Sequence, residues 1–134
     1  MKRTLERLQE PSYAALRIVS GALFLFHGLQ KLFGVGGQAI AFSAKPQLWI
    51  GGCIELVCGA AIALGLFTRC TAFVASGTMA VAYFQFHFGE FANLHWLPLV
   101  NHGEPAIVYC FLFFFVATRG SGIASIDRAL KRDV

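Results

Sequence analysis

Charged residues are scarce in this chain. Only 13% of its 134 residues are Asp, Glu, Lys or Arg, whereas 57% are hydrophobic and 14 are Phe. A water-soluble domain of this size carries more charge on its surface. The scarcity therefore argues against a soluble domain. It favours an integral membrane protein made of one domain, residues 1–134, with almost no extramembrane part.

Sequence motifs of several enzyme classes are also missing. The chain has no glycine-rich phosphate loop, no Ser/His/Asp arrangement and no dinucleotide fingerprint. Four cysteines are present, but they show neither a C-x-x-C spacing nor a framework of secreted disulfides. We expect these cysteines to be small apolar packing residues: Cys53, Cys58, Cys70 and Cys110.

The basic residues are sorted by loop and do not gather on one stripe, so the net charge of +4 does not indicate a nucleic-acid partner. They precede the first apolar run, separate the second from the third, and follow the fourth: Lys2, Arg3 and Arg7; Arg69; Arg119, Arg128, Lys131 and Arg132. By the positive-inside rule, this distribution predicts that both termini and the short middle loop are cytoplasmic.

Four apolar runs are interpreted as membrane spans. They cover about residues 13–33, 48–66, 71–88 and 105–118. A span needs roughly 20 residues to cross a hydrocarbon core of about 30 Å, so the fourth run is short. The predicted fold is all-α, a transmembrane four-helix bundle with both termini cytoplasmic. The predicted location is the bacterial inner (plasma) membrane, with the lipid bilayer as partner.

Glu55 is the one charged residue between positions 48 and 66. A carboxylate inside a span is costly and by default indicates a functional site. It shares a helical face with Gly51, Gly59 and Ala63, and such small-residue faces permit close helix contact. We therefore expect Glu55 to point into the bundle. The alternative is a buried ion pair that only fixes helix packing.

Three side chains of the first span are candidate partners of Glu55: Lys31, Arg17 and His27. His27 and Lys31 are one helical turn apart and face the same way. Arg17 lies at the cytoplasmic end of the span, where a long side chain is expected to extend to the headgroups. The sequence leaves open which of the three pairs with Glu55.

Further polar residues are expected near the same depth, in the outer half of the bundle. The predicted ligand-binding residues are Gln30, Tyr83, Gln85, His87, Asn101 and Glu104. The long connection over 89–104 is apolar, and we expect it to cover this polar layer as a lid. Aromatic side chains are abundant in the same region and suit the flat walls of a pocket for a quinone ring; the alternative is that they face lipid. These residues are Phe24, Phe26, Phe33, Tyr83, Phe84, Phe86, Phe88 and Trp96.

Haem and metal ions are weaker interpretations of the same residues. His27 and His87 lie on different predicted helices, and two such histidines alone are a poor indication of bis-histidine haem ligation. His87, His95, His102 and Glu104 lack the close spacing of a metal site. No cofactor is evident from the sequence. We predict neither haem nor metal, and a quinone remains compatible with the pattern.

Several segments resemble the DoxX family of small four-helix membrane proteins. The segments are Leu16-Arg17 with Gly21, the run H-G-L-Q-K-L-F-G at 27–34, Ile54-Glu55-Leu56 with Gly59, the turn G-L-F-T-R at 65–69, N-H-G-E-P-A at 101–106 and S-I-D at 125–127. The similarity covers nearly the whole chain. It departs from the family at Ala124, where the family often has Trp, a change that affects an interfacial anchor.

The resemblance implies a four-helix membrane fold and, more loosely, a redox role. The family's name comes from subunits linked to a terminal quinol oxidase and to thiosulfate:quinone oxidoreduction. Other relatives are described as membrane partners of redox-defence enzymes.

The first functional hypothesis is a quinone-linked redox subunit. In it, Glu55 and His27 exchange a proton and Lys31 balances the charge, which makes these three the predicted catalytic residues. The chain has no evident electron carrier, so the hypothesis requires a redox-protein partner subunit. The first alternative is a non-enzymatic scaffold that docks other proteins at its basic cytoplasmic ends. The second is a carrier of small solutes or lipids, which needs a homo-oligomer because four helices are few for alternating access.

Overall fold

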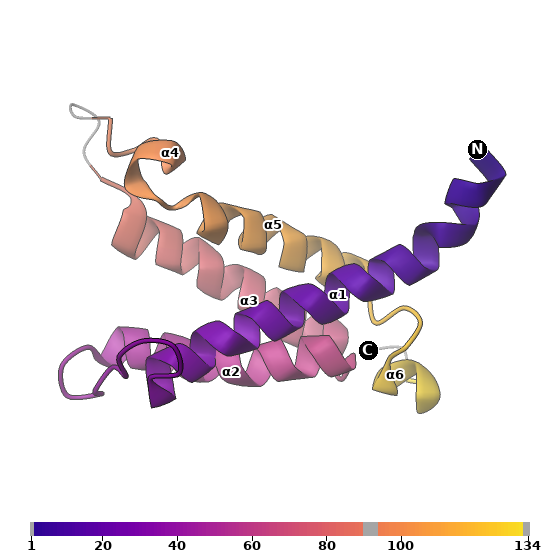
Figure 1. The fold of residues 1–134 in the computed structure, drawn as a ribbon, viewed down its shortest axis with the longest axis horizontal. Coiled ribbons are helices and arrows are strands. Elements are labelled where there is room, and N and C mark those ends of the chain that lie inside the picture. The colour runs from indigo at the N-terminus through magenta and orange to yellow at the C-terminus, as the bar shows by residue number, and fades with distance from the viewer. Residues whose placement is uncertain (1, 90–93, 133–134) are drawn as a thin grey trace.

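All regular structure in the described residues is helical. The computed structural model describes residues 2–89 and 94–132 (Figure 1). The helices are α1 (Lys2–Phe33), α2 (Pro46–Leu64), α3 (Thr68–Ala82), a π-helical turn η1 (Tyr83–His87), α4 (Pro98–Asn101), α5 (Glu104–Arg119) and α6 (Ile126–Ala129). The predicted all-α class is confirmed for these ranges. Residues 90–93, a part of the predicted lid over 89–104, lie outside the described residues.

Glycine and proline fix the ends of the long helices. α1 ends before Gly34 and α2 ends before Gly65, and both glycines have a positive φ, 71° and 68°. The carbonyl groups left open at the end of α2 accept hydrogen bonds from the backbone N–H groups of Gly65 and Leu66. α2 and α5 each carry a proline in the first turn, where a missing N–H costs little. The helices therefore lie close to the predicted runs, although α1 begins well before residue 13.

Among the described residues, two helices are long and apolar enough to cross a membrane by length and composition, α1 over Leu5–Phe33 and α2. α3 has 15 residues and α5 has 16, which is shorter than a typical span. The π-helical turn η1 extends α3 by five residues.

The backbones of α1 and α2 touch through glycine, and the second half of α1 lies along α2 (Figure 1). A Cβ atom on Gly28 would lie only 2.5 Å from the backbone nitrogen of Leu56, and Gly59 lies equally tightly against Leu25. The predicted small-residue face is wrong at its first position. Gly51 has open space beside it, and Gly52 packs against α1 instead. An α-helix has 3.6 residues per turn, so residues spaced by four rotate gradually away from the side of the helix that faces its neighbour.

α3 pairs with α5, and side chains join this pair to α1. Phe24 of α1 and Phe113 of α5 are both buried, with ring centroids 4.8 Å apart. Ile62 of α2 and Val116 of α5 are fully buried in the same core. The core thus receives side chains from all the long helices, and it holds the two pairs together.

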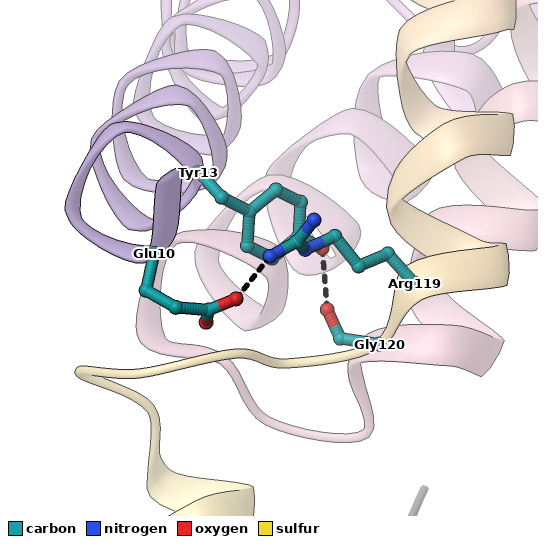
Figure 2. A network of polar contacts seen from close by, with 4 residues as sticks. All are labelled: Glu10, Tyr13, Arg119 and Gly120. Carbon is teal, nitrogen blue, oxygen red and sulfur yellow. Dashed lines mark hydrogen bonds and ion pairs between the residues drawn. The ribbon is translucent and has the colours of Figure 1, made fainter. Parts of the chain in front are cut away.

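A polar cluster ties the first third of α1 to the end of α5. Figure 2 shows the Tyr13 hydroxyl donating to the carbonyl of Gly120 and Arg119 donating to the carboxylate of Glu10. The Arg119 guanidinium also lies over the Tyr13 ring, 4.3 Å from its centroid. This cluster orients α1 against α5 at the end where the chain leaves α5.

Arg17 does not extend to the headgroups, so that prediction was wrong. The side chain is fully buried, and its guanidinium donates to the carbonyls of Ile62 at 2.6 Å, Ala63 at 2.8 Å and Ala124 at 2.7 Å. Carbonyl groups at the C-terminus of a helix lack helical partners and carry partial negative charge, which favours a cation. Arg17 therefore caps α2 and holds the segment after α5. It does not pair with Glu55.

Asp127 of α6 stabilises the start of α3. Its carboxylate accepts hydrogen bonds from the backbone N–H of Phe67 at 2.9 Å and from the backbone N–H and hydroxyl of Thr68 at 3.0 and 2.9 Å. Burial favours the neutral acid, but these hydrogen bonds outweigh it and hold the pKa of Asp127 below its ordinary value. A charged carboxylate at a helix N-terminus is also favourable for the helix dipole.

Candidate functional site

Lys31 is the partner of Glu55. The Lys31 ammonium nitrogen lies 2.5 Å from Glu55 Oε1, so the ion pair joins α1 to α2. Glu55 is 3% exposed and Lys31 26%, which confirms that Glu55 points into the protein. The missing side chain of Gly52 makes room for this pair, since a Cβ there would lie 3.0 Å from the Lys31 Cβ.

The ion pair with Lys31 uses only one of the two oxygens of the Glu55 carboxylate. Glu55 Oε2 is buried and has no hydrogen-bond partner among the described residues. A buried acceptor without a donor usually costs about 1–3 kcal/mol. A hydrogen-bond donor on a ligand, or a proton bound to the carboxylate, would remove this cost.

Glu55 and Lys31 lie in the wall of a cavity of about 710 Å³. That volume is within the usual range of small-molecule sites. Its polar lining includes His27, Lys31, Glu55, Gln85 and His87, and its apolar lining includes Phe24, Ile54, Met79, Phe86 and Tyr109. The cavity thus combines a few polar groups with an aromatic and aliphatic wall.

The π-helical turn at the end of α3 supplies one side of this cavity. The backbone N–H of Phe88 donates to the carbonyl of Tyr83 at 2.8 Å, a bond that spans five residues. In the turn, Gln85, Phe86 and His87 all line the cavity. His87 is held in place, because its Nδ1 lies 3.0 Å from the backbone carbonyl of Asn101. Turns of this type occur often at functional sites.

Tyr109 is a cavity residue that the sequence reasoning missed. It lies on α5, edge-on to the His27 ring with centroids 6.3 Å apart, and it stacks on Phe113 at 5.5 Å. The sequence did contain an indication of this role. Tyr109 lies one helical turn after Pro105 inside an apolar run, and a buried tyrosine hydroxyl usually forms a hydrogen bond.

The model of one family, DoxX, matches residues 12–88. The chain belongs to the DoxX family. A relative from Haemophilus influenzae, described as "Uncharacterized protein", is 37% identical over 128 residues, which make up 92% of this chain and 93% of the relative. No solved structure matches this chain. Membership of the family, together with the two long apolar helices, supports a membrane protein.

The fold brings five of the nine predicted site residues together around the cavity: His27, Lys31, Glu55, Gln85 and His87. The other four do not line it: Gln30, Tyr83, Asn101 and Glu104. Within the described residues, no three His, Cys, Asp or Glu side chains converge as metal ligands.

Three of those four side chains support the backbone nearby. The amide of Gln30 lies against Gly37. The Tyr83 hydroxyl donates to the carbonyl of Trp96 at 3.0 Å. The Asn101 amide donates to a loop carbonyl at 2.9 Å, and its oxygen accepts from the N–H of Gly103 at 2.7 Å. The Gln30 contact supports the connection between α1 and α2, and the Tyr83 and Asn101 hydrogen bonds hold the connection between α3 and α5.

Glu104 does not face Glu55. Its side chain is exposed and lines a separate groove between α1 and α5, together with Leu23 and Val108. Counting residues along a helix predicts the depth of a side chain but not the direction in which it points. The shared depth of the two carboxylates therefore stays a prediction, and Glu104 does not line the cavity that contains Glu55.

Proposed function

We propose that this protein is a multi-pass protein of the bacterial inner membrane and that α1, α2, α3 with η1, and α5 cross the bilayer as a four-helix bundle. Large apolar side chains on every one of these helices support the proposal, because they are exposed: Phe26 57%, Val57 64%, Phe73 65% and Phe111 69%. Apolar surface on this scale is favourable in hydrocarbon and unfavourable in water. The 16 residues of α5 measure about 24 Å, a shortfall that local thinning of the bilayer accommodates.

The proposed activity is quinone-linked proton exchange in the cavity. The observation that carries it is the Lys31–Glu55 ion pair in the wall of an otherwise largely apolar, aromatic-lined cavity. Aromatic side chains offer flat surfaces for a ring, and a short distance away a carboxylate and an imidazole offer groups that take up and release protons. In this proposal Glu55 and His27 exchange the protons, and Lys31 balances the charge of the carboxylate.

Electrons in the proposed reaction come from or go to a redox-protein partner subunit. The sequence contains no recognisable motif for an electron carrier. The basic residues near both ends, which the positive-inside rule assigns to the cytoplasm, are the proposed docking surface for that partner. This makes the chain a subunit that binds quinone and handles protons.

A quinone titration tests the proposed activity. Purified protein in lipid nanodiscs is titrated with a short-tailed quinone, and the unfolding temperature is followed. Binding to the folded state raises this temperature as ligand concentration passes the Kd. We expect a rise for wild type, a smaller one for Glu55→Gln, and an unchanged rise for the control Glu10→Gln, whose carboxylate lies in the polar cluster of Figure 2. Absence of any thermal or spectral response in wild type would contradict the proposal.

A further inference from the structure

The cavity reaches the outer surface of the helix bundle between α2 and α3. Ile50 of α2 and Val81 of α3 both line it, and they are 50% and 53% exposed. Each lies seven residues from an exposed valine on its own helix, Val57 or Val74, and residues seven apart share a helical face. The cavity wall therefore continues onto the faces of α2 and α3 that the proposed four-span bundle turns toward lipid.

Two glycines lie in this part of the wall, Gly51 of α2 and Gly77 of α3. Gly28 and Gly59 press against the backbone of a neighbouring helix, but in the described part of the chain no atom of another helix lies within 4 Å of a Cβ on Gly51 or Gly77. Glycine weakens the interior of a helix compared with alanine, so close packing does not account for these two. Glycine also lets a ligand approach the backbone closely, and their position in the cavity wall fits that role.

This opening leads to the candidate site. α2 and α3 run in opposite directions from the short turn that joins them and diverge away from it (Figure 1). Glu55 and Gly77 are each eleven residues from Leu66 in that turn, so they lie at a similar height. Both line the cavity. Gly77 thus stands where the opening comes level with the ion pair of Glu55 and Lys31.

A groove between α1 and α5 is the other apolar surface next to the cavity. Leu23 and Val108 line it, and Tyr109 borders both the groove and the cavity. The Tyr109 ring packs against the rings of Phe24 and Phe113, with centroids 5.9 and 5.5 Å apart. Aromatic packing therefore separates this groove from the cavity, whereas the glycines leave space between α2 and α3.

We infer that the ligand enters the cavity sideways from the bilayer, between α2 and α3, and that its apolar tail stays beside Gly51 and Gly77 while its ring lies near Glu55. This inference rests on the proposed function and adds an entry route and a tail site to it. An apolar tail is unfavourable beside the polar groups of the cavity and favourable in hydrocarbon, so a tailed ligand takes this orientation.

The test separates the tail from the ring. Full-length protein in nanodiscs is titrated with two quinones that share one ring, one without a tail and one with a decyl tail, and the shift in unfolding temperature is followed. Each Kd is expressed as a mole fraction in the bilayer, so that partitioning into lipid does not contribute to the comparison. Wild type should bind both with Kd values within about threefold, because a tail gains little by moving from lipid to an equally apolar opening.

Gly51→Leu and Gly77→Leu fill the opening. We expect the tailed quinone to bind at least about tenfold more weakly to either variant, because tail and leucine compete for the same space. The tailless quinone should bind as it does to wild type. Leucine favours a helix over glycine, so Gly77→Leu should unfold at or above the wild-type temperature, which excludes a folding defect as the cause.

Val108→Trp is the matched control. Val108 is exposed on α5 and lines the groove between α1 and α5 but not the cavity, so the variant adds bulk at the alternative position for a tail. Both quinones should bind to it as they do to wild type. Weaker binding of the tailed quinone here, with no change in the glycine variants, would place the tail in that groove and overturn the inference.

The remaining outcomes separate the inference from the proposed function. If the leucine variants bind both quinones like wild type, or lose both equally, the tail does not lie beside these glycines. Either result overturns the inference and leaves the proposed quinone site in place. Failure of both quinones to bind wild type overturns the proposed function, and the inference with it.

Discussion

At the scale of single residues, two ion pairs of similar chemistry lie in different surroundings. Glu55 is 3% exposed in its pair with Lys31, whereas Glu10 is 51% exposed in its pair with Arg119. Exposed pairs contribute little to stability, because water and ions screen the charges. Breaking a buried pair costs more, because the remaining charge is left without a partner.

The first prediction concerns these two pairs. Glu55→Ala should lower the free energy of unfolding by about 2 kcal/mol, less than for a fully buried pair because Lys31 is partly exposed. Glu10→Ala should lower it by less than about 1 kcal/mol. Denaturant unfolding in detergent measures both values. Equal losses of unfolding free energy in the two variants would show that the burial of Glu55 does not determine how much its ion pair contributes to stability.

The second prediction is a dependence of stability on pH. The folded state holds the pKa of Asp127 below its ordinary value of 3.8, so the charged carboxylate stabilises the fold. This contribution is fully present above that ordinary value and is lost as the pH falls through the lower pKa of the folded state. Unfolding measured between pH 6 and pH 3 should therefore show a decline in wild type.

Asp127→Asn isolates that contribution. The amide oxygen of the variant still accepts hydrogen bonds, but the amide nitrogen does not. The variant therefore loses the negative charge and the hydrogen bonds at one of the two oxygens, either the one from Phe67 or the two from Thr68. We expect the free energy of unfolding to fall by about 1–3 kcal/mol at neutral pH. The difference from wild type should shrink as the pH falls. A difference that stays constant down to pH 3 would rule out the carboxylate as its source.

At the scale of elements, α1 and α2 form a unit because glycine lets their backbones touch. Gly21 and Gly28 of α1 meet Gly59 and Gly52 of α2 and the residues around them. In lipid, helix association depends on such close packing, because burying apolar side chains gains little there. The same close contact brings Lys31 within hydrogen-bond distance of Glu55. Helix packing and the candidate site therefore depend on one interface.

The third prediction tests that interface. Gly28→Ala should destabilise the fold by about 1–3 kcal/mol, because the new Cβ would lie 2.5 Å from the backbone nitrogen of Leu56. Gly77→Ala on α3 is the control, since nothing lies within 4 Å of a Cβ there, and alanine favours a helix by up to about 1 kcal/mol. Thermal unfolding in detergent compares them. Equal stability of the two variants would mean that the helices do not depend on this contact.

The sequence predicted the helices better than it predicted the site. Long apolar runs and flanking Gly and Pro determine where helices lie, so the predicted runs and α1, α2, α3 and α5 largely coincide. Charge and depth limited the partner of Glu55 to three candidates, Lys31, Arg17 and His27, and the structure identifies Lys31 as the partner. The direction of a side chain around its helix depends on tertiary packing, which a pattern does not contain. Arg17, Gly51, Glu104 and Tyr109 were therefore misplaced or missed.

At the scale of the whole molecule, the proposed topology rests on the distribution of charge. Basic residues lie near both ends and in the turn between α2 and α3, where Arg69 donates to the carbonyls of Ala117 and Thr118 at the end of α5. The end of the molecule that carries Arg69 and Arg119 is therefore the one that the positive-inside rule assigns to the cytoplasm. The cavity residues His27 and Lys31 lie near the opposite end of α1, and Glu55 lies at the middle of α2. Their position in the outer half of the membrane stays a prediction.

The fourth prediction is the orientation in the membrane. A green fluorescent protein fused to the C-terminus should be fluorescent in bacterial cells, and alkaline phosphatase at the same point should be inactive. Alkaline phosphatase inserted in the loop between α1 and α2, after Gln38, should be active. The opposite pattern would reverse the orientation, and activity at both points would contradict a four-span topology.

Labelling with a photoreactive quinone tests the central claim most directly. The full-length protein in nanodiscs is irradiated with the reagent, with and without an excess of unreactive hydroquinone, and the modified residues are identified by mass spectrometry. We predict labels on cavity residues such as Ile54, Phe86 and Tyr109 that the competitor removes. Labels spread over outward-facing residues such as Phe73 and Phe111, unaffected by the competitor, would contradict a quinone site in this cavity.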